Sequence, residues 1–417
     1  MNKSILEIAD VIDSLHATPE YVTEGYPMVR VVDVNNCFLH LEKCLLVSAS
    51  TCDRHNKNYV PQEGDIIITR VGSYGMMAYV DTKELFCLGQ NIAIISPKKR
   101  KDGKFLYYYL QSPYLQNIIY GNSGGSSYKC IGLEQIKKLP LEIDGIDCNR
   151  IGDLLYLIDL KIEKNNQVYD KLEKLAKKIY SYWFVQFDYP DENNKPYKSS
   201  GGKMVWDESI ETNIPIGWKV EKTSDFIEVI RGVSYDTDDI SDKPQEGYIP
   251  LLKSNNLQND RLLLEDVIYV SKKNVSDEQF LDNNSIFVTM SSGSTEHVGK
   301  TAVICYDTAY TFGAFCSKIV IKPQYRCFIS LFFLSEYFKK KIRTIVVGTS
   351  IKNINNAHLT ENLIPVPDEK ILRRFESMVN PVLNKQGEIT RENQKLVSMR
   401  KYLLPLLMNG QVGFRKE

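Results

Sequence analysis

The sequence of 417 residues has no apolar run long enough to cross a membrane, and its charges cancel. A membrane-spanning helix needs about 20 mostly apolar residues, so we expect no membrane partner. The 52 basic and 52 acidic residues argue against a simple non-specific nucleic-acid binder, whose affinity comes mainly from neutralising phosphates. A net charge of zero is compatible with a sequence-specific nucleic-acid binder whose basic residues lie on one face, or one that shares phosphate contacts with a partner. Basic clusters at 98–101 and 339–343 are either binding patches or solvated surfaces.

Regularly spaced cysteine pairs are also missing. Nine cysteines without such spacing suit a reducing cytoplasm better than a disulfide framework. The first residues include the acidic Glu7 and no apolar core of a secretory signal, so we expect a cytoplasmic protein. Cys37, Cys44 and Cys52 precede His55, but their gaps are too wide for a zinc knuckle. We therefore expect no metal site.

Catalytic fingerprints are absent or broken. The segment from Gly293 to Thr301 resembles a phosphate-binding loop, but five residues separate its glycines where that motif has four. The run 302–306 that follows is strand-like, whereas a phosphate-binding loop opens a helix. No Gly-x-Gly-x-x-Gly follows a strand, and the Asn/Asp-Pro-Pro-Tyr/Phe motif of amino-methyltransferases is absent. We expect a chain with no catalytic residues and no cofactor of its own.

An internal repeat organises the chain. Five short segments recur in the same order at one nearly constant offset, so the chain is a duplicated unit of roughly 220 residues. The matched segments are 6–8 with 227–229, 24–26 with 246–248, 65–69 with 285–289, 92–95 with 318–321, and 139–141 with 364–366.

Each copy has a mixed part followed by a helical part. Short β-branched and aromatic runs lead into an amphipathic helix-like stretch, at 105–120 and 328–347. Apolar residues at steps of three or four then predict one long helix over 147–184 and a second at the C-terminus. Pro381 is a candidate to shift the start of the second helix, and Gly387 to loosen it midway.

Such long amphipathic helices have no core of their own, so we expect the two to pair as an antiparallel coiled coil. The alternative is that each packs only on its own domain. The predicted fold class is α+β: two mixed α/β domains separated by two long antiparallel helices, with a pseudo-two-fold internal repeat. The expected parts are a first domain over 1–146, a central long helix over 147–187, a polar connecting region over 188–219, a second domain over 220–368, and a C-terminal long helix over 369–417.

Polar loops follow corresponding elements of the two copies. Arg, Lys, Asn, Ser and Thr side chains read base edges when a loop carries them into a groove. The loops differ in residue identity between the copies, as two readers of different half-sites would need; solvated Gly/Ser turns are the alternative. The candidate DNA-contacting residues are Arg70, Ser73, Tyr74, Ser126, Tyr128, Lys129, Lys253, Asn255, Ser292, Ser294, Thr295, Lys300, Thr349, Ser350, Lys352 and Asn353.

The centre of the chain resembles a known family. Tyr182–Pro190 leads into Lys195–Gly202, and this motif, between two halves that each end in a long helix, resembles the specificity subunits of type I restriction–modification systems. Ile214–Trp218 resembles the motif that precedes a recognition domain in that family. The segments 348–354 and 363–367 resemble its exit motif. The resemblance covers essentially the whole chain.

The first copy departs from the family pattern. No Pro-x-Gly-Trp precedes the first domain, and its exit segment, Cys130–Leu133, is degenerate. The resemblance is therefore less close in the first domain than in the second.

The resemblance implies a non-catalytic subunit that reads a bipartite asymmetric DNA site. One target-recognition domain would enter the major groove at each half, and the helices would set the half-site spacing. The implied partners are double-stranded DNA, two modification subunits that methylate adenine with S-adenosylmethionine, and restriction subunits with ATP- and Mg-dependent helicase and nuclease activities. Two other classes stay open: a stand-alone, nuclease-like enzyme acting on DNA, and a scaffold without DNA contact.

Overall fold

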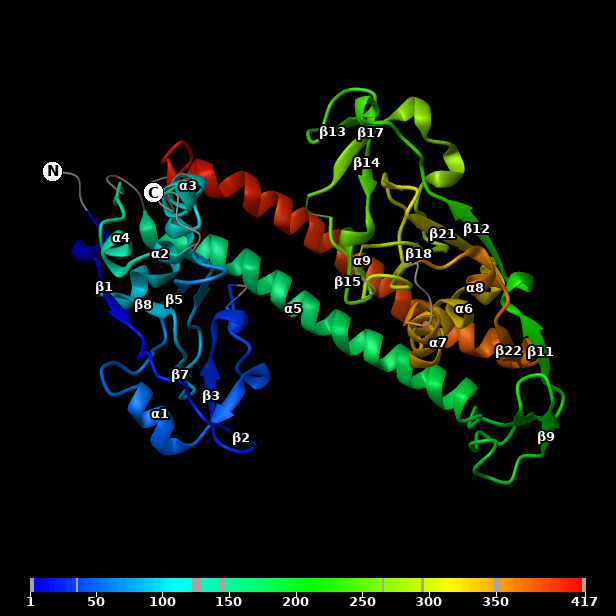
Figure 1. The fold of residues 1–417 in the computed structure, drawn as a ribbon. Helices are drawn as coiled ribbons and strands as arrows, with labels where there is room; N and C mark the ends of the chain where they lie inside the picture. Colours follow the sequence, from blue (N-terminus) through cyan, green and yellow to red (C-terminus); the bar gives the residue numbers. More distant parts are fainter. Residues whose placement is uncertain are drawn as a thin grey trace. The chain divides into compact units, whose positions relative to one another are not determined.

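The structure is a computed structural model, and it describes residues 4–34, 37–121, 130–142, 147–264, 266–293, 296–347 and 353–414. The chain divides into two compact units. The first unit contains Met1–Lys164 and Asn393–Glu417, and the second contains Asn165–Glu392. Two long helices, α5 (Cys148–Tyr180) and α9 (Glu369–Met408), each contribute one end to each unit (Figure 1).

The first unit contains two four-stranded sheets. One has the order β1-β8-β5-β6 and is antiparallel throughout. The other has the order β2-β4-β3-β7, with β3 and β7 parallel. Every residue of β5 and β8 is buried, as their uninterrupted apolar runs predict. The elements are β1 (Ala9–Asp13), β2 (Tyr21–Val22), β3 (Tyr26–Val29), β4 (Leu45–Val47), α1 (Ala49–His55), β5 (Ile66–Thr69), β6 (Met77–Tyr79), β7 (Cys87–Leu88), β8 (Ile92–Pro97), α2 (Gly103–Leu110), α3 (Pro113–Gly121) and α4 (Leu133–Lys137).

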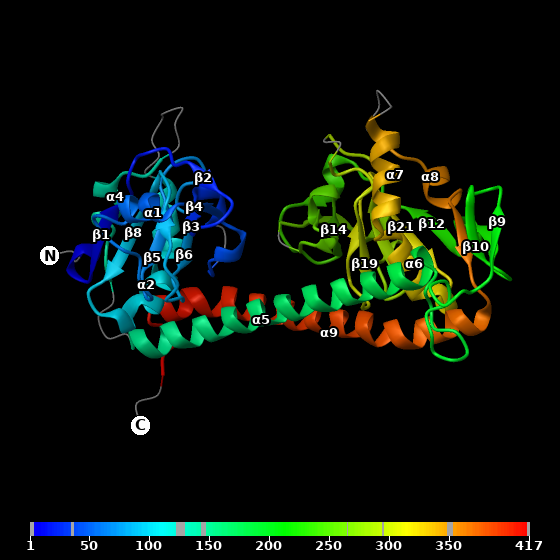
Figure 2. The same cartoon turned by 90° about the horizontal axis from the view of Figure 1, so that it is seen from below.

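The second unit repeats this plan. Its sheets have the orders β12-β21-β18-β19 and β13-β17-β14-β20, with β14 and β20 parallel. Figure 2 shows β12, β21 and β19 of the first of these sheets and β14 of the second. Three two-stranded sheets are added: β9–β10, β11–β22 and β15–β16. The elements are β9 (Met204–Asp207), β10 (Thr212–Pro215), β11 (Lys219–Lys222), β12 (Ile227–Arg231), β13 (Ile240–Ser241), β14 (Tyr248–Leu252), β15 (Leu257–Gln258), β16 (Arg261–Leu262), β17 (Ile268–Ser271), β18 (Ser285–Thr289), β19 (Thr301–Ile304), β20 (Thr311–Phe312), β21 (Cys316–Ile321), α6 (Arg326–Phe333), α7 (Glu336–Val347), α8 (Asn356–Thr360) and β22 (Leu363–Val366).

The equal strand orders confirm the duplication, but three of the sequence matches were out of register. The N–H of Ile5 donates to the carbonyl of Leu139, and the N–H of Thr223 donates to that of Asn362. The segment 139–141 therefore corresponds to 362–364, and its predicted match with 364–366 was wrong by two residues. Val11 pairs with Ile95, and Val229 pairs with Ile319. The strand 9–13 therefore corresponds to 227–231, and the predicted match of 6–8 with 227–229 was wrong by three residues. By the same pairs Ile95 corresponds to Ile319, so the match of 92–95 with 318–321 was wrong by two. Short apolar triplets resemble one another at several registers, whereas the ladder of hydrogen bonds allows only one.

The helix-like stretches 105–120 and 328–347 are each two helices, not one. The break between α2 and α3 comes at Ser112, whose hydroxyl accepts the backbone N–H of Leu115 at 3.4 Å, and Pro113 follows as the first helical residue. Ser335 plays the same part between α6 and α7, accepting the N–H of Phe338 at 3.2 Å. Both breaks follow from local capping chemistry.

The long helices are more continuous than the sequence predicted. α9 runs through Pro381 and Gly387 without a break, so the expected shift and loosening were wrong. The helix begins instead after Asp368, whose carboxylate accepts the N–H of Ile371 at 2.9 Å. α5 continues from Tyr180 into one π-helical turn, Ser181–Val185. The predicted polar connecting region, 188–219, contains the β9–β10 hairpin.

In each unit α5 and α9 pack together and also on the unit's own domain. The first-unit core joins Ile151 and Leu155 of α5 to Leu407 of α9 and to Phe105 of α2. The start of α5 thus meets the end of α9, as the antiparallel prediction requires.

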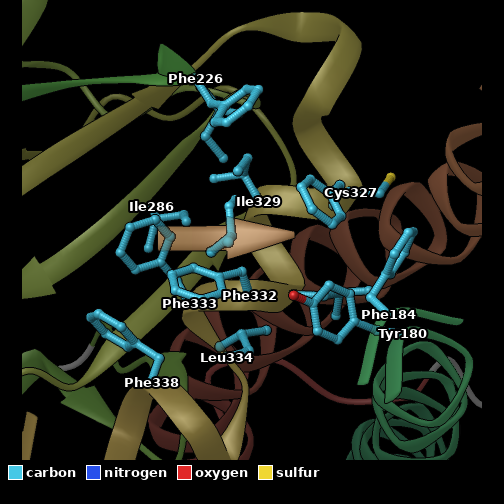
Figure 3. Packing of buried hydrophobic residues seen from close by; sticks show 14 of the residues in the cluster. Tyr180, Phe184, Phe226, Ile286, Cys327, Ile329, Phe332, Phe333, Leu334 and Phe338 are labelled. Carbon is cyan, nitrogen blue, oxygen red and sulfur yellow. The ribbon is translucent and has the colours of Figure 1, made fainter. Parts of the chain in front are cut away.

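The second-unit core joins Tyr180 of α5 and the neighbouring Phe184 to Phe375 of α9 and Phe328 of α6. Here the end of α5 meets the start of α9. Figure 3 shows Tyr180 and Phe184 beside Cys327 and other side chains of α6.

Candidate nucleic-acid interface

In the first unit, the loop 70–75 after β5 lies against the segment that precedes α4. The backbone N–H of Ile131 donates to the carbonyl of Arg70 at 2.9 Å. The loop closes at Gly75, which has a φ of +78° and leaves no room for a side chain, because an added Cβ would lie 2.9 Å from the Cγ2 of Ile119. The loop 70–75 and the segment 130–132 therefore lie side by side in this unit, and the candidate residues 126–129 lie outside the described part of the chain.

The second unit builds the same arrangement around the loop 290–299. The N–H of Ile354 donates to the carbonyl of Met290 at 2.8 Å. Gly299 has a φ of +76°, and an added Cβ would lie 2.2 Å from the Cγ2 of Ile342 on α7. The backbone hydrogen bond to the loop and the left-handed glycine that closes it are thus present in both units, and we call them the frame.

The loops inside this common frame differ in length. The N–H of Gly75 donates to the carbonyl of Thr69 at 2.8 Å, and the N–H of Gly299 donates to that of Thr289 at 2.8 Å. Five residues, 70–74, lie between these anchors in the first unit, and nine, 290–298, in the second. The frame is kept while the loop it presents changes.

Arg70 is held by its own unit. Its guanidinium forms an ion pair with Asp13 of β1 at 2.5 Å, its Nε donates to the carbonyl of Ile131 at 3.4 Å, and the side chain is 17% exposed. Bidentate contact with a base edge would require the ion pair to open, whereas a single contact through an N–H group outside the ion pair would not.

Ser73 and Tyr74 lie at the tip of the same loop and differ in exposure. Ser73 is exposed, and its carbonyl accepts the hydroxyl of Thr69 at 2.5 Å. Tyr74 is buried and packs edge-on against Tyr120 of α3, with ring centroids 5.3 Å apart. Tyr74 therefore supports the loop, whereas Ser73 is presented on the surface.

The described candidates of the second unit fall into two groups. Asn353 is exposed and forms an isolated antiparallel β-bridge with Ser291 of the loop. Ser292 of the same loop is half-buried. Lys300 is also half-buried, and its Nζ lies 3.4 Å from the Nδ1 of His297. Lys253 and the exposed Asn255 belong instead to the turn after β14, in the other sheet.

Half of the candidate residues lie outside the described part of the chain, and they stay predictions. They are Ser126, Tyr128, Lys129, Ser294, Thr295, Thr349, Ser350 and Lys352.

Phe315 is a surface residue at this edge that the sequence did not single out. Its carbonyl accepts the N–H groups of Met290 at 2.9 Å and Ser291 at 3.1 Å, while its ring is 71% exposed. The equivalent residue of the first unit is Asn91, whose carbonyl accepts the N–H of Arg70 at 2.8 Å. Comparing the copies in the correct register would have found it, because an aromatic residue stands where the other copy has an amide.

About half of the basic residues in the two clusters have partners within the protein. Arg100 pairs with the buried Asp65, and Lys339 and Lys341 donate to Asp260 and Asn362. Lys340 and Arg343 of α7 are exposed. These two side chains point out from the helix that leads toward residues 348–352, where they could meet phosphates.

Metal chemistry finds little support in the described ranges. No group of three or more His, Cys, Asp or Glu side chains there could hold a metal ion. Burial raises the pKa of Cys37 to about 12 and that of Cys44 to about 11, so both are protonated thiols at neutral pH when no metal is bound. In the same ranges, no helix is both long and apolar enough to span a membrane.

These features define a class of protein: a duplicated mixed α/β scaffold, continued by long helices, that presents divergent loops from equivalent places. The family model described as "Type I restriction modification DNA specificity domain" matches residues 3–174 and 215–391. The chain belongs to this family.

Known relatives agree with this assignment. The chain is 30% identical over 206 residues to the type I restriction enzyme EcoKI specificity subunit of Escherichia coli K12, covering 48% of this chain and 44% of that protein. It is 22% identical over 359 residues to the MjaIX specificity subunit of Methanocaldococcus jannaschii, covering 84% and 78%. The match thus spans less than half the length of the Escherichia coli relative.

A solved structure shares the fold. The type I restriction–modification S subunit from M. genitalium superimposes with a TM-score of 0.58 at 14% sequence identity, covering 98% of this chain and 95% of that one. The α+β fold class with two repeated mixed domains is therefore confirmed.

Proposed function

We propose that this chain is the non-catalytic specificity subunit of a cytoplasmic type I restriction–modification complex and that it reads a bipartite asymmetric DNA site. The observation that carries the proposal is the duplicated frame with divergent loops. The same backbone hydrogen bonds and the same left-handed glycine hold a five-residue loop in one unit and a nine-residue loop in the other. Reading two different half-sites requires this combination of a constant support and variable donors.

At these loops, some side chains would contact phosphates and others would contact base edges. Lys340 and Arg343 are suited to phosphates, which position the protein without reporting sequence. Ser73, Ser292 and Asn353 are suited to base edges, asparagine above all to adenine. The undescribed candidates would complete each half-site. Because the chain has zero net charge, its partners would share the contacts with phosphates.

Catalysis would then reside in partner subunits. Two modification subunits would methylate adenine with S-adenosylmethionine, and restriction subunits would use ATP and Mg. The outer face of α5 and of the π-helical turn after it supports a docking role. Val168 and Leu175 of α5 and Tyr182 of that turn recur at steps of seven and are 45%, 48% and 38% exposed. Residues at that spacing share one side of a helix, and apolar side chains repeated along one exposed side favour a protein partner.

Methylome sequencing of cells with and without this gene tests the proposal. One bipartite asymmetric motif carrying methyladenine should disappear when the gene is deleted. An unchanged methylome would contradict the proposal. Cleavage or methylation of DNA by the purified chain alone would establish the stand-alone enzyme instead.

A pair of substitutions separates the reader from a scaffold without DNA contact. Lys352→Ala with Asn353→Ala should reduce sequence-specific binding by the assembled complex by about tenfold or more, since one good base contact contributes about 1–3 kcal/mol. Lys57 and Asn58 form an exposed pair of the same composition in another loop, and Lys57→Ala with Asn58→Ala is the matched control. Unchanged specificity in both variants would favour the scaffold.

A further inference from the structure

The β15–β16 hairpin of the second unit is fastened to α5 through its turn. Asn259 and Asp260 have φ values of 49° and 62°, the left-handed pair typical of a type I′ turn. The Asp260 carboxylate accepts a hydrogen bond from Lys177 of α5 at 2.9 Å and another from Lys339 of α7 at 2.6 Å. Its side chain is only 14% exposed. One carboxylate therefore joins the hairpin, the long helix and the domain helix.

The next residue adds a second attachment to the same helix. Arg261 forms an ion pair with Asp170 and lies 3.4 Å from the carboxylate of Glu173. Its guanidinium also lies 3.9 Å from the centre of the Tyr169 ring, a cation–π arrangement that favours Arg over Lys. The residues 169–177 of α5 thus present two acids, a base and an aromatic ring to two residues of the hairpin.

A ligand site does not explain this cluster. The cavity under the hairpin, lined by Tyr169, Glu173 and Asp260 among others, has a volume of about 10 Å³, enough for about one water molecule. The charges pair with one another, although the buried Nε of Arg261 has no hydrogen-bond partner, and their geometry is that of an attachment.

Two attachments at separate places on α5 fix the angle between the second domain and this helix, whereas one attachment leaves that angle free. The domain also contacts the end of α5 through Phe184 and Phe328, whose ring centroids are 4.8 Å apart. Asp170 and Phe184 are separated by roughly 20 Å along a helix, at 1.5 Å per residue. Apolar contacts tolerate small slips, but a slip of the hairpin along α5 would leave partly buried charges without partners.

We propose that the β15–β16 hairpin is a positioning element that holds the second recognition domain at one place and angle along α5, and that Asp260 and Arg261 thereby restrict the spacer length between the two half-sites. This inference rests on the proposed function, because spacer length has meaning only for a bipartite target. It assigns no base contact to the hairpin.

The test uses the assembled complex with its modification subunits. The wild-type methylome first gives the motif and its spacer. Methyl transfer is then measured on duplexes with that spacer and with one base pair more or fewer. Asp260→Ala with Arg261→Ala should leave the half-site sequences unchanged but lower the preference for the correct spacer by about tenfold, equivalent to about 1.4 kcal/mol. An unchanged preference would overturn the proposal.

Controls keep the outcomes distinct. Asp239→Ala removes an ion pair with Lys273, 2.8 Å long, that lies within the domain and does not reach the helix; it should leave spacer preference unchanged. If the double variant fails to assemble, Arg261→Lys is the deciding variant, because it keeps the charge and loses the planar stack on Tyr169. It should lower the preference for the correct spacer by a smaller factor than the double variant. An unchanged spacer preference would overturn the proposal. A wild-type complex with no bipartite motif would instead contradict the proposed function.

Discussion

Asp159 is a buried carboxylate on α5 whose partners come from the first domain and from α9. It is 5% exposed, accepts the hydroxyl of Tyr108 at 2.7 Å, and pairs with Arg400. Tyr108→Phe should lower the free energy of unfolding by about 1.5–3 kcal/mol, the range for a hydrogen bond to a charged group, as measured by urea denaturation. Tyr114→Phe is the control, because its hydroxyl is 3.4 Å from Glu142 on the surface. An equal effect of the two substitutions would contradict this account.

Asp260 should make stability depend on pH. Burial raises the pKa of its carboxyl, but hydrogen bonds from Lys339 and Lys177 outweigh that, and the pKa lies below its usual value. The folded state therefore binds fewer protons than the unfolded state near pH 4, so the contribution is present above that pH and is lost as pH falls further. The difference in unfolding free energy between wild type and Asp260→Asn should shrink from about pH 5 to about pH 2. A difference that stays constant or grows on acidification would contradict the assignment.

Single residues were the hardest to predict from the sequence. The polar composition of the loops was visible, but the partner of Arg70 is Asp13, 57 residues away, and no local pattern reports such a pair. Tyr74 looked like a contact residue because it stands in a Gly/Ser loop, yet it packs against Tyr120. Exposure within a loop is decided by tertiary packing.

At the scale of elements, the close approach of α9 to the domain explains why a glycine lies inside a 40-residue helix. An added Cβ at Gly387 would lie 2.2 Å from the carbonyl oxygen of Cys305. Gly387→Ala would gain about 1 kcal/mol of helix propensity, but we expect a net loss of about 1–3 kcal/mol from overpacking against backbone. Thermal unfolding measures the difference. Ser398→Ala, at an exposed position of the same helix, should change stability by less than about 0.5 kcal/mol, and a stabilised Gly387→Ala variant would contradict the close packing.

Element type was easier to predict than register. The buried strands β5 and β18 follow from uninterrupted apolar runs, and α5 follows from its spacing of apolar residues. The pairing of β1 with β8 could not be predicted residue by residue, because short apolar segments resemble one another at several positions along the chain. The breaks at Ser112 and Ser335 were available locally as capping signals.

At the scale of the whole molecule, duplication was the most informative property of the sequence. It predicted two similar domains and a pair of long helices before any fold was known, and the equal sheet orders of the two units confirm the repeat. The duplication could not predict that Gly75 and Gly299 close the two loops, because this depends on how closely Gly75 approaches α3 and Gly299 approaches α7. The function rests on the loops within this frame, and they are the parts that differ.

The most direct test replaces residues 290–298 by the five residues 70–74 of the first unit and sequences the methylome of the complex. The anchors Thr289 and Gly299 stay in place, so the frame should survive. If each unit reads its own half-site, the methylated motif should change in one half only, with the other half intact. Changed bases in both halves, or a motif identical to that of the wild type in an assembled complex, would contradict the claim that these loops are two separate readers.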